Sequence, residues 1–448
     1  MNTLKNMGSV TIIGLGVSGI GLAKLAKSVG IKVFISEIKN DISDLQLQEL
    51  KQLGVDYELG GHTERALECD AVLLSSGISP RSAAVLCASR KGVPCIGELD
   101  FVSTYLSSKL IGITGSNGKT TTTSLVAHIL NGMGVSCAAT GNIGKSIADF
   151  VGTSYECLAV ELSSFQLFWA NRFQCDVAVV TNIAPDHIDW HGSFDEYVAS
   201  KRRLLSLQGP EGWSILQKRD RSLLGRDTKT RTLCLSWDSN ENPWEICMEK
   251  KYAYLNTDEQ RISLFSYENL SLVGNHNMEN IAMASAAVWC LTKRVSESHS
   301  LETFSPLHHR CELVGEIDGV LYIDDSKGTN VAASSTAMES INGRKIVILG
   351  GQGKGEDYAP LAKTVAREAE WAVLLGSEAD KIESALHEEH YTSIYRATDM
   401  DEAVRFSKSV ASSGMVVLLS PACTSWDMYP NYKARGEHFK QAVLGYTK

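Results

Sequence analysis

A short glycine-rich segment, TGSNGKTT at residues 114–121, constrains the fold of this chain more than any other feature. It follows the apolar run 110–113 and precedes a helical pattern over 119–130. A strand that leads through a glycine loop into a helix is the repeating element of sheets whose parallel strands are covered by helices. The segment therefore predicts an α/β fold with a mostly parallel sheet.

The same segment predicts a site for phosphate groups. Backbone N–H groups of a glycine turn and of a helix N-terminus bind phosphate oxygens, Lys119 can neutralise their charge, and Thr120 can reach Mg²⁺. The spacing G-x-x-x-x-G-K-[ST] is not met, because Ile113 stands five residues before Gly118, so the loop is a shortened variant. A glycine turn with a surface lysine is the alternative interpretation. We expect ATP to contact the whole loop, namely Gly115, Ser116, Asn117, Gly118, Lys119, Thr120 and Thr121.

Composition limits the class of protein and its partners. The 448 residues are too many for one hydrophobic core, so we expect about three domains. A net charge of −9 argues against nucleic acid as the main partner, and no stretch has the ~18 uninterrupted apolar residues of a membrane span. Eleven cysteines without a C-x-x-C pair indicate reduced thiols. We therefore expect a cytoplasmic protein with small-molecule ligands.

The β-rich and helical runs divide the chain into three α/β parts. The predicted strands lie at 10–13, 32–35, 71–75, 110–113, 157–161, 177–181, 321–324, 345–349, 372–375 and 415–419. Residues 213–264 predict a smaller antiparallel appendage, and the polar stretch 292–306 predicts a boundary near residue 305. The predicted domains are 1–97, 98–305 and 306–448.

A second glycine turn, GLGVSGIG at 14–21, lies between a predicted strand and a predicted helix. Gly14, Gly16 and Gly19 have dinucleotide-binding spacing, and Glu37 ends the next strand, where an acid holds ribose hydroxyls. Taken alone, the turn predicts a binding site for NAD. The alternative is that the strand and the helix pack tightly there and need small residues for that reason only. An NAD interpretation leaves the ATP loop in the same chain unexplained.

Polar side chains gather at the predicted carboxyl edge of the central sheet. Glu161 ends an apolar strand there and is a candidate Mg²⁺ ligand, with a helix cap or salt bridge as the alternative. The next strand leads to Asp186, His187 and Asp189, which we interpret as functional because they neighbour the nucleotide loop. Lys201 is one of three basic residues in YVASKRRLL, and composition alone places it on a solvated helix face.

Other polar loops are weaker candidates, because glycine-rich polar loops are usually only turns. They hold Asn277 and Asn280, His309 and Arg310, Lys327 and Thr329, and Lys354.

The complete set of motifs resembles the Mur ligase family. The resemblance spans nearly the whole chain and rests on the ordered segments GLGVSG, LSSGISP, TGSNGKTTTT, GNIG, ELSSFQL, TNIAPDHIDWHGS with ASKRR, GNHNMEN, HHRCE, DDSKGTN, GGQGKGED and SPACTSWDMYPNYKARGEHF. The last segment is similar to the member that adds D-glutamate to UDP-N-acetylmuramoyl-L-alanine, and the DNPR motif of the diamino-acid-adding relative is absent. A folylpolyglutamate-type ligase shares the shortened ATP loop but gives no reason for the first glycine turn.

The resemblance implies three domains: a Rossmann-like N-terminal domain for the UDP part of the substrate, a central P-loop ATPase-like domain, and a Rossmann-like C-terminal domain for the amino acid. It implies a monomer that makes peptidoglycan precursors in the cytoplasm. The implied contacts to the UDP-substrate are Gly14, Gly16, Ser18, Gly19, Glu37, Gly77, Asn142 and His187. Glu37 stands where relatives often have aspartate.

The implied reaction runs through an acyl phosphate: ATP phosphorylates the alanyl carboxylate, and the amine of D-glutamate then displaces phosphate. The catalytic residues implied by the resemblance are Lys119, Glu161, His187 and Lys201. Two Mg²⁺ ions are implied, one at Thr120 and Glu161 and one at His187 and Lys201. The resemblance also implies that Lys201 is carbamylated, which would convert its amine into a carboxylate that suits a hard cation.

The remaining implied contacts come from later parts of the chain. Those to ATP are Asn277, Asn280, Arg310 and Lys327, and those to D-glutamate are Lys327, Thr329, Lys354, Ser425 and Tyr432. Relatives have Phe where Tyr432 stands. Domain closure is implied, because separate domains must meet to complete the site. A nicotinamide-dependent oxidoreductase and a P-loop NTPase switch that makes no amide remain alternatives.

Overall fold

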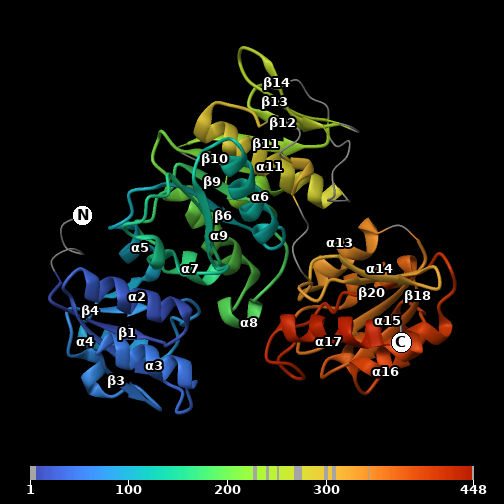
Figure 1. Ribbon diagram of the computed structural model, residues 1–448, viewed down its shortest axis with the longest axis horizontal. Coiled ribbons are helices and arrows are strands. Elements are labelled where there is room, and N and C mark those ends of the chain that lie inside the picture. The colour runs from blue at the N-terminus through green and yellow to red at the C-terminus, as the bar shows by residue number, and fades with distance from the viewer. Residues whose placement is uncertain are drawn as a thin grey trace. The chain divides into compact units, whose positions relative to one another are not determined.

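The computed structural model describes residues 7–225, 230–238, 242–249, 252–266, 275–296, 301–304, 309–341 and 343–445. Among these residues the chain forms two compact units. The first unit takes in 7–183, 198–266 and 279–302, and the second takes in 184–197, 275–278 and 303–445. The first unit holds two β-sheets and the second holds one (Figure 1). The prediction of an α/β fold built on three mostly parallel sheets is confirmed.

The first sheet is entirely parallel, in the order β3-β2-β1-β4-β5. Its strands are β1 (Ser9–Ile13), β2 (Lys32–Glu37), β3 (Asp56–Leu59), β4 (Ala71–Leu74) and β5 (Cys95–Gly97), and its helices are α2 (Val17–Ser28), α3 (Asp44–Leu53), η1 (Glu64–Leu67), α4 (Ala83–Lys91) and α5 (Glu98–Ser103). The chain leaves β1 toward β2 on one side, while β4 pairs with β1 on the other. Ligands bind at such a switch point, at the carboxyl ends of the strands. The glycine turn after β1 and the loop after β4 both lie there.

The second sheet has the order β14-β13-β12-β11-β10-β9-β6-β8-β7. Its strands are β6 (Lys109–Thr114), β7 (Cys137–Gly141), β8 (Cys157–Glu161), β9 (Val177–Val180), β10 (Trp213–Gln217), β11 (Arg231–Ser236), β12 (Glu245–Met248), β13 (Tyr252–Asn256) and β14 (Arg261–Ser266). Helices and turns around it are α6 (Lys119–Gly132), η2 (Ile147–Phe150), α7 (Ser164–Phe168), α9 (Phe194–Ser206), η3 (Lys218–Asp220), α10 (Arg221–Leu224) and α11 (Asn275–Thr292).

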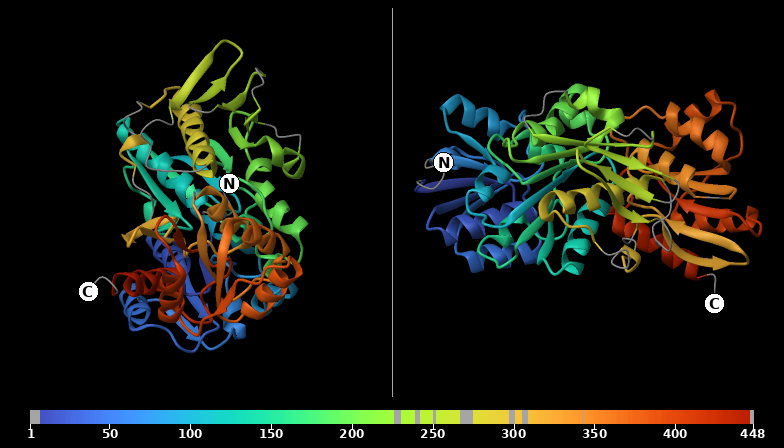
Figure 2. Two further views of the ribbon diagram at one scale, coloured as in Figure 1. Left: turned by 90° about the vertical axis from the view of Figure 1, so that its right-hand side faces the viewer. Right: turned by 90° about the horizontal axis from the view of Figure 1, so that it is seen from above.

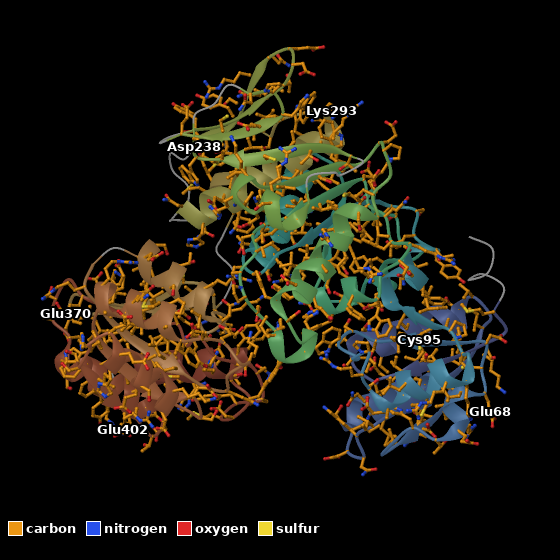
Figure 3. All side chains as sticks on the ribbon, turned by 180° about the vertical axis from the view of Figure 1, so that it is seen from behind. Glu68, Cys95, Asp238, Lys293, Glu370 and Glu402 are labelled. Carbon is orange, nitrogen blue, oxygen red and sulfur yellow. The ribbon has the colours of Figure 1, made fainter. Side chains whose placement is uncertain are left out.

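The antiparallel appendage predicted for 213–264 is wrong for its first half. Strands β10, β11 and β12 continue the parallel sheet from β9, and only β13 and β14 run antiparallel. All five residues of β10 are buried, as is typical of a parallel strand covered on both faces. The ammonium of Lys293, which follows α11, lies 4.2 Å and 4.3 Å from the ring centres of Trp213 and Trp289, which ties α11 to this extension. Figure 3 labels Lys293.

The third sheet has the order β15-β16-β20-β17-β18-β19, and only its edge strand β15 is antiparallel. Its strands are β15 (Glu312–Ile317), β16 (Val320–Asp324), β17 (Lys345–Gly350), β18 (Ala369–Leu375), β19 (Ile394–Arg396) and β20 (Val416–Leu419). Helices α13 (Val331–Ser340), α14 (Ala359–Glu368) and α15 (Ala379–Glu388) cover one face, and α16 (Met400–Val410) and α17 (Tyr432–Gly445) cover the other (Figure 2). The short helix α8 (Ile188–His191) belongs to the same unit.

The domain boundaries at 97/98 and 305/306 stay predictions, and the polar stretch 292–306 lies partly outside the described residues. Within the part of the chain that the structure describes, no helix is both long and apolar enough to span a bilayer.

Candidate active site

The predicted phosphate loop connects β6 to α6, and its two glycines are required by its geometry. Gly115 and Gly118 have φ angles of +146° and +81°, which side-chain-bearing residues rarely adopt. A Cβ on Gly115 would lie 1.9 Å from Thr181 Oγ1, and one on Gly118 would lie 2.3 Å from Asn280 Oδ1. The loop therefore packs directly against the end of β9 and against α11.

Asn182, which directly follows Thr181 at the end of β9, holds the phosphate loop in place through hydrogen bonds. The sequence analysis missed this residue. Its side-chain oxygen accepts a hydrogen bond from Asn117 N at 2.9 Å, and its amide nitrogen donates to Asn117 O at 3.0 Å. Its backbone oxygen accepts from Ser116 N at 2.9 Å. The only signal in the sequence was its place at the end of a strand neighbouring the loop.

Two lysine amines meet at the carbonyl oxygen of Gly115. Lys119 Nζ donates to this oxygen at 2.9 Å and to Ser116 O at 2.8 Å. Lys201 Nζ donates to it at 2.7 Å, and only 1% of Lys201 is exposed. The solvated face that composition suggested for Lys201 is therefore wrong: α9 turns this lysine into the protein and leaves Arg202 exposed.

Glu161 lies at the carboxyl end of β8, beside Ile113 of β6. Its Oε1 accepts a hydrogen bond from Asn142 Nδ2 at 3.0 Å. Its Oε2 is buried and has no hydrogen-bond partner among the residues that the structure describes. A buried carboxylate oxygen without a donor is a fitting ligand for a hard cation such as Mg²⁺, so the residue fits the predicted role.

The predicted nucleotide contact Asn280 also reaches this site. Thr122 Oγ1 of α6 donates to Asn280 Oδ1 at 3.3 Å, so Asn280 lies against the first turn of the phosphate-loop helix. Asn277 belongs to the second unit, as do Arg310 and Lys327. Their contacts to ATP stay predictions.

The first sheet holds six of the eight residues predicted for the UDP-substrate; Asn142 follows β7 of the second sheet, and His187 lies in the second unit. A Cβ on Gly19 would lie 2.0 Å from Gly14 O, so the glycine allows α2 to approach the turn. Glu37 Oε2 accepts from Leu15 N at 2.6 Å, and its Oε1 accepts from Lys39 N at 3.0 Å. Glu37 therefore fixes the turn itself, and its contact with a ribose stays a prediction. The other predicted residues on this edge are Gly16, Ser18 and Gly77, with φ +92° at Gly77.

A buried ionic cluster in the second unit contains Lys354. Its amine lies 2.6 Å from Asp186 Oδ1 and 3.9 Å from Glu356 Oε1. Asp186 Oδ2 lies 3.6 Å from His187 Nε2. Burial raises the pKa of the Glu356 carboxyl to about 7. His187 thus lies in the second unit, and its predicted metal site with Lys201 stays a prediction.

The predicted amino-acid residues gather at the carboxyl edge of the third sheet. Lys327 Nζ lies 5.4 Å from the ring centre of Tyr432, and Thr329 N donates to Lys327 O at 2.9 Å. Ser425 Oγ is buried and, among the described residues, has no hydrogen-bond partner.

Arg435, which the sequence analysis did not single out, fixes these loops. Its guanidinium donates to Ser326 O at 2.8 Å, Cys423 O at 3.0 Å and Thr424 O at 3.1 Å. Burial lowers its pKa to about 10. One buried side chain therefore connects the loop of Lys327 to the loop of Ser425.

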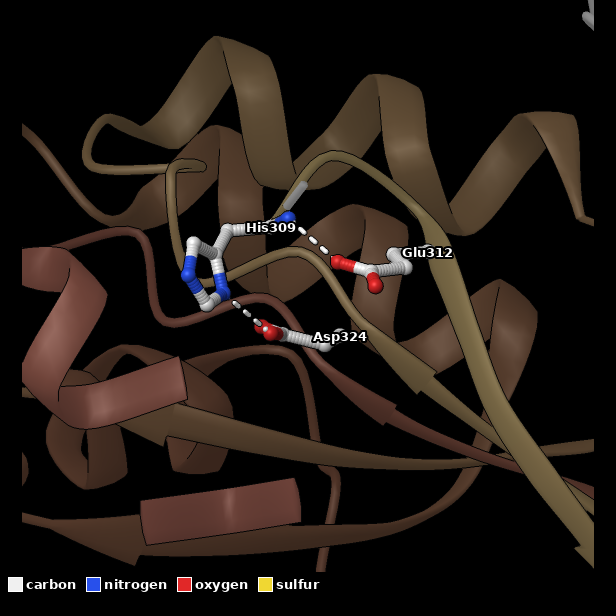
Figure 4. Close-up of side chains that lie close together, drawn as sticks. All are labelled: His309, Glu312 and Asp324. Atoms are coloured by element: carbon white, nitrogen blue, oxygen red, sulfur yellow. Dashed lines mark hydrogen bonds and ion pairs between the residues drawn. The ribbon is translucent and has the colours of Figure 1, made fainter. Parts of the chain in front are cut away.

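His309, Glu312 and Asp324 form the group of described residues whose ligand atoms lie close enough for a metal (Figure 4). His309 Nδ1 shares a hydrogen bond of 2.6 Å with Asp324 Oδ2, and His309 N donates to Glu312 Oε2 at 2.7 Å. The Lys440 ammonium lies 3.0 Å from both oxygens of Glu312 and already neutralises it. The group therefore fixes the backbone at His309, whose φ is +63°, next to Arg310.

Comparisons with known proteins cover all three sheets. Three family models match: the MurD N-terminal domain over residues 9–84, the Mur ligase middle domain over 113–288, and the Mur ligase, glutamate ligase domain over 309–423. Among solved structures, the MurF ligase from Thermotoga maritima in complex with ADP has a TM-score of 0.62 at 16% identity, with 100% of both chains covered. MurC from the same organism has a TM-score of 0.59 at 17% identity, with 98% of this chain and 100% of that one covered. These structures share the fold.

Closer relatives carry the name UDP-N-acetylmuramoylalanine–D-glutamate ligase. One from Pelotomaculum thermopropionicum is 36% identical over 448 residues, with 98% of each chain covered. One from Alkaliphilus metalliredigens is 33% identical over 451 residues, again with 98% of each chain covered. The resemblance found in the sequence is confirmed, and the chain belongs to the Mur ligase family.

Proposed function

We propose that this ligase uses ATP to join the amine of D-glutamate to the alanyl carboxylate of UDP-N-acetylmuramoyl-L-alanine, a step of peptidoglycan precursor synthesis. The observation that carries the proposal is the match, over 98% of both chains, to relatives named for this reaction. The geometry of the phosphate loop supports it.

In the first step an oxygen of the alanyl carboxylate attacks the γ-phosphorus of ATP, and the bond from that phosphorus to the ADP oxygen breaks. Backbone N–H groups of the loop and the Lys119 ammonium stabilise charge on the phosphate oxygens. Lys119 is held at the loop by two carbonyl oxygens. Its amine therefore needs no large rearrangement to reach a phosphate placed on the N-terminus of α6.

Mg²⁺, when bound, neutralises phosphate charge and polarises the phosphorus–oxygen bond. Glu161 and Thr120 are the proposed ligands of one ion, and this role is supported by Glu161 Oε2, which has no hydrogen-bond partner within the described part of the chain. His187 and carbamylated Lys201 are the proposed ligands of a second ion. A carbamate replaces the positive charge of the Lys201 ammonium with a carboxylate group whose two oxygens share one negative charge, which suits a cation.

In the second step the amine of D-glutamate, once it has lost a proton, attacks the acyl carbon, and the bond from that carbon to phosphate breaks. Lys327, Thr329, Lys354, Ser425 and Tyr432 are the proposed amino-acid contacts. Lys354 already binds a carboxylate, that of Asp186, and this supports its proposed pairing with a carboxylate of D-glutamate. Asn277, Asn280, Arg310 and Lys327 are the proposed contacts that complete the ATP site on closure.

We propose a cytoplasmic monomer. The eleven free cysteines, seven of them buried, fit a reducing compartment.

The decisive experiment measures phosphate release from ATP with D-glutamate, L-alanine, L-lysine or diaminopimelate, each paired with its matching UDP-muramoyl acceptor. We expect release only with D-glutamate and UDP-N-acetylmuramoyl-L-alanine together. Release that ignores the amino acid would support the NTPase switch instead. Tight NADH binding without a response to the UDP-sugar would support the oxidoreductase.

A further inference from the structure

A buried carboxylate, that of Glu98, lies where the two sheets of the first unit meet. Glu98 follows β5 directly and begins α5, and only 4% of it is exposed. Its Oε2 accepts hydrogen bonds from Ser76 Oγ at 2.8 Å and from Gln166 Nε2 at 3.1 Å. Its Oε1 accepts from Ser146 Oγ at 3.4 Å. None of these three donors carries a charge.

Each donor comes from a segment that bears a proposed substrate or metal contact. Ser76 precedes Gly77 in the loop after β4, and Ser146 ends the loop that begins at Asn142. Gln166 lies on α7, which follows Glu161 and β8. A single carboxylate therefore joins the UDP-binding edge of the first sheet to two segments at the catalytic edge of the second.

Other contacts hold the same junction. The indole nitrogen of Trp169, just after α7, donates to Ile78 O at 2.9 Å. A Cβ on Gly97 would lie 2.6 Å from Trp169 Cβ, so the end of β5 touches this segment directly. A Cβ on Gly21 would lie 2.6 Å from Ser146 Oγ, so α2 rests on the same serine. The loop after β4 is thus held from two sides.

The junction requires an acceptor at position 98. Gln166 Oε1 accepts from Ser163 N at 3.0 Å within the cap of α7, so Gln166 must present its NH₂ group to Glu98. An amide at position 98 can offer one acceptor atom but not two, and its own NH₂ would face a donor. A buried donor left without an acceptor destabilises its surroundings.

We propose that Glu98 is a positioning residue that fixes the Gly77 loop relative to the Asn142 loop, so that the acyl end of the UDP-linked substrate reaches the phosphate loop. This inference rests on the proposed function. Glu98 touches neither ATP nor the amino acid in this scheme. Loss of the Glu98 carboxylate should therefore raise KM for the UDP-linked substrate and leave KM for ATP nearly unchanged.

The test compares Glu98→Gln with the matched control Asp100→Asn. Asp100 lies on the same helix with 5% exposure, and its carboxylate accepts hydrogen bonds from the backbone N–H groups of residues 171–173, none of which is a proposed substrate contact. Both variants lose one buried negative charge, so both should lower Tm. Only Glu98→Gln should raise KM for UDP-N-acetylmuramoyl-L-alanine, by about tenfold, the effect of one lost hydrogen bond to a charged group.

Calorimetric titration of the UDP-substrate without ATP gives a second readout, and Ser76→Ala gives a milder variant that keeps Glu98. We expect weaker binding in Glu98→Gln and in Ser76→Ala, with KM for ATP within about twofold of wild type. The proposal is overturned if Ser76→Ala binds like wild type, or if Glu98→Gln raises both KM values equally or changes only Tm, as the control does. A wild-type chain without ligase activity would instead remove the proposed function.

Discussion

The side-chain amine of Lys201 donates a hydrogen bond to the carbonyl oxygen of Gly115 at 2.7 Å, inside the phosphate loop. A lysine with 1% exposure at this position has little contact with solvent. As an ammonium it would repel a metal ion bound to the phosphates, whereas as a carbamate it would attract one.

Lys201→Ala should therefore abolish ligation, and a small carboxylate such as formate should partly restore it by replacing the carbamate oxygens. The measurement is D-glutamate-dependent phosphate release with and without added formate. Arg202→Ala is the matched control, because Arg202 is the next residue of α9 and is exposed. Unimpaired ligation in Lys201→Ala would refute the role.

The raised pKa of Glu356 predicts that the stability of the folded chain depends on pH. Burial raises its pKa from 4.5 to about 7, so the folded chain binds this proton more tightly than the unfolded chain. The stabilisation is complete at pH values below the pKa that Glu356 has in the unfolded chain. It is lost as pH rises through the pKa that Glu356 has in the folded chain. The charged groups around it are Lys354, which opposes the shift, and Asp186 and Asp189, which add to it.

Glu356→Gln carries no proton to lose. Its stability relative to wild type should therefore rise by up to about 3 kcal/mol between about pH 5 and pH 8. Denaturant unfolding at both pH values measures the difference. Glu388→Gln, which removes an exposed carboxyl of α15, should show no such trend, and an equal trend in both variants would contradict the assignment.

We predict that the ring of Tyr432, and not its hydroxyl, supports the amino-acid site. Lys327 Nζ lies 5.4 Å from the centre of this ring, within the range of a cation–π interaction. Tyr432→Phe should keep KM for D-glutamate within about twofold, whereas Tyr432→Leu should raise it about two- to fivefold. A large rise in KM for Tyr432→Phe would show that the hydroxyl binds substrate.

The sequence predicted the parts of the fold that follow from local pattern. Apolar runs followed by glycine loops marked β1 and β6, and the element order then required parallel sheets. Strand β10 was misassigned because a short buried strand beside polar turns has the same pattern whether its neighbour runs parallel or antiparallel. Its pairing with β9 depends on contacts between distant residues.

For the candidate site, glycine and lysine motifs supplied the residues that we predict to contact phosphates, but not the residues that hold the loops of the site in place. Asn182, Arg435 and Glu98 act through hydrogen bonds to backbone or side chains far away in the sequence. Lys201 was misjudged because the composition of its helix does not reveal which of three basic residues turns inward. Such roles require the fold.

Asn182 offers the sharpest test of loop support, because the same domain contains a matched asparagine. Asn182 bonds through its side chain to both N and O of Asn117, and Asn131 bonds in the same way to N and O of Cys137 near the other end of α6. Each alanine variant removes these two hydrogen bonds, and Asn131→Ala also removes one from Asn131 Nδ2 to Ala127 O, so Tm should fall at least as far in Asn131→Ala as in Asn182→Ala. Asn182→Ala alone should raise KM for ATP, by about tenfold, because the backbone N–H groups of the phosphate loop lose their fixed orientation. Equal KM values for ATP in the two variants would show that Asn182 supports the fold and not the nucleotide.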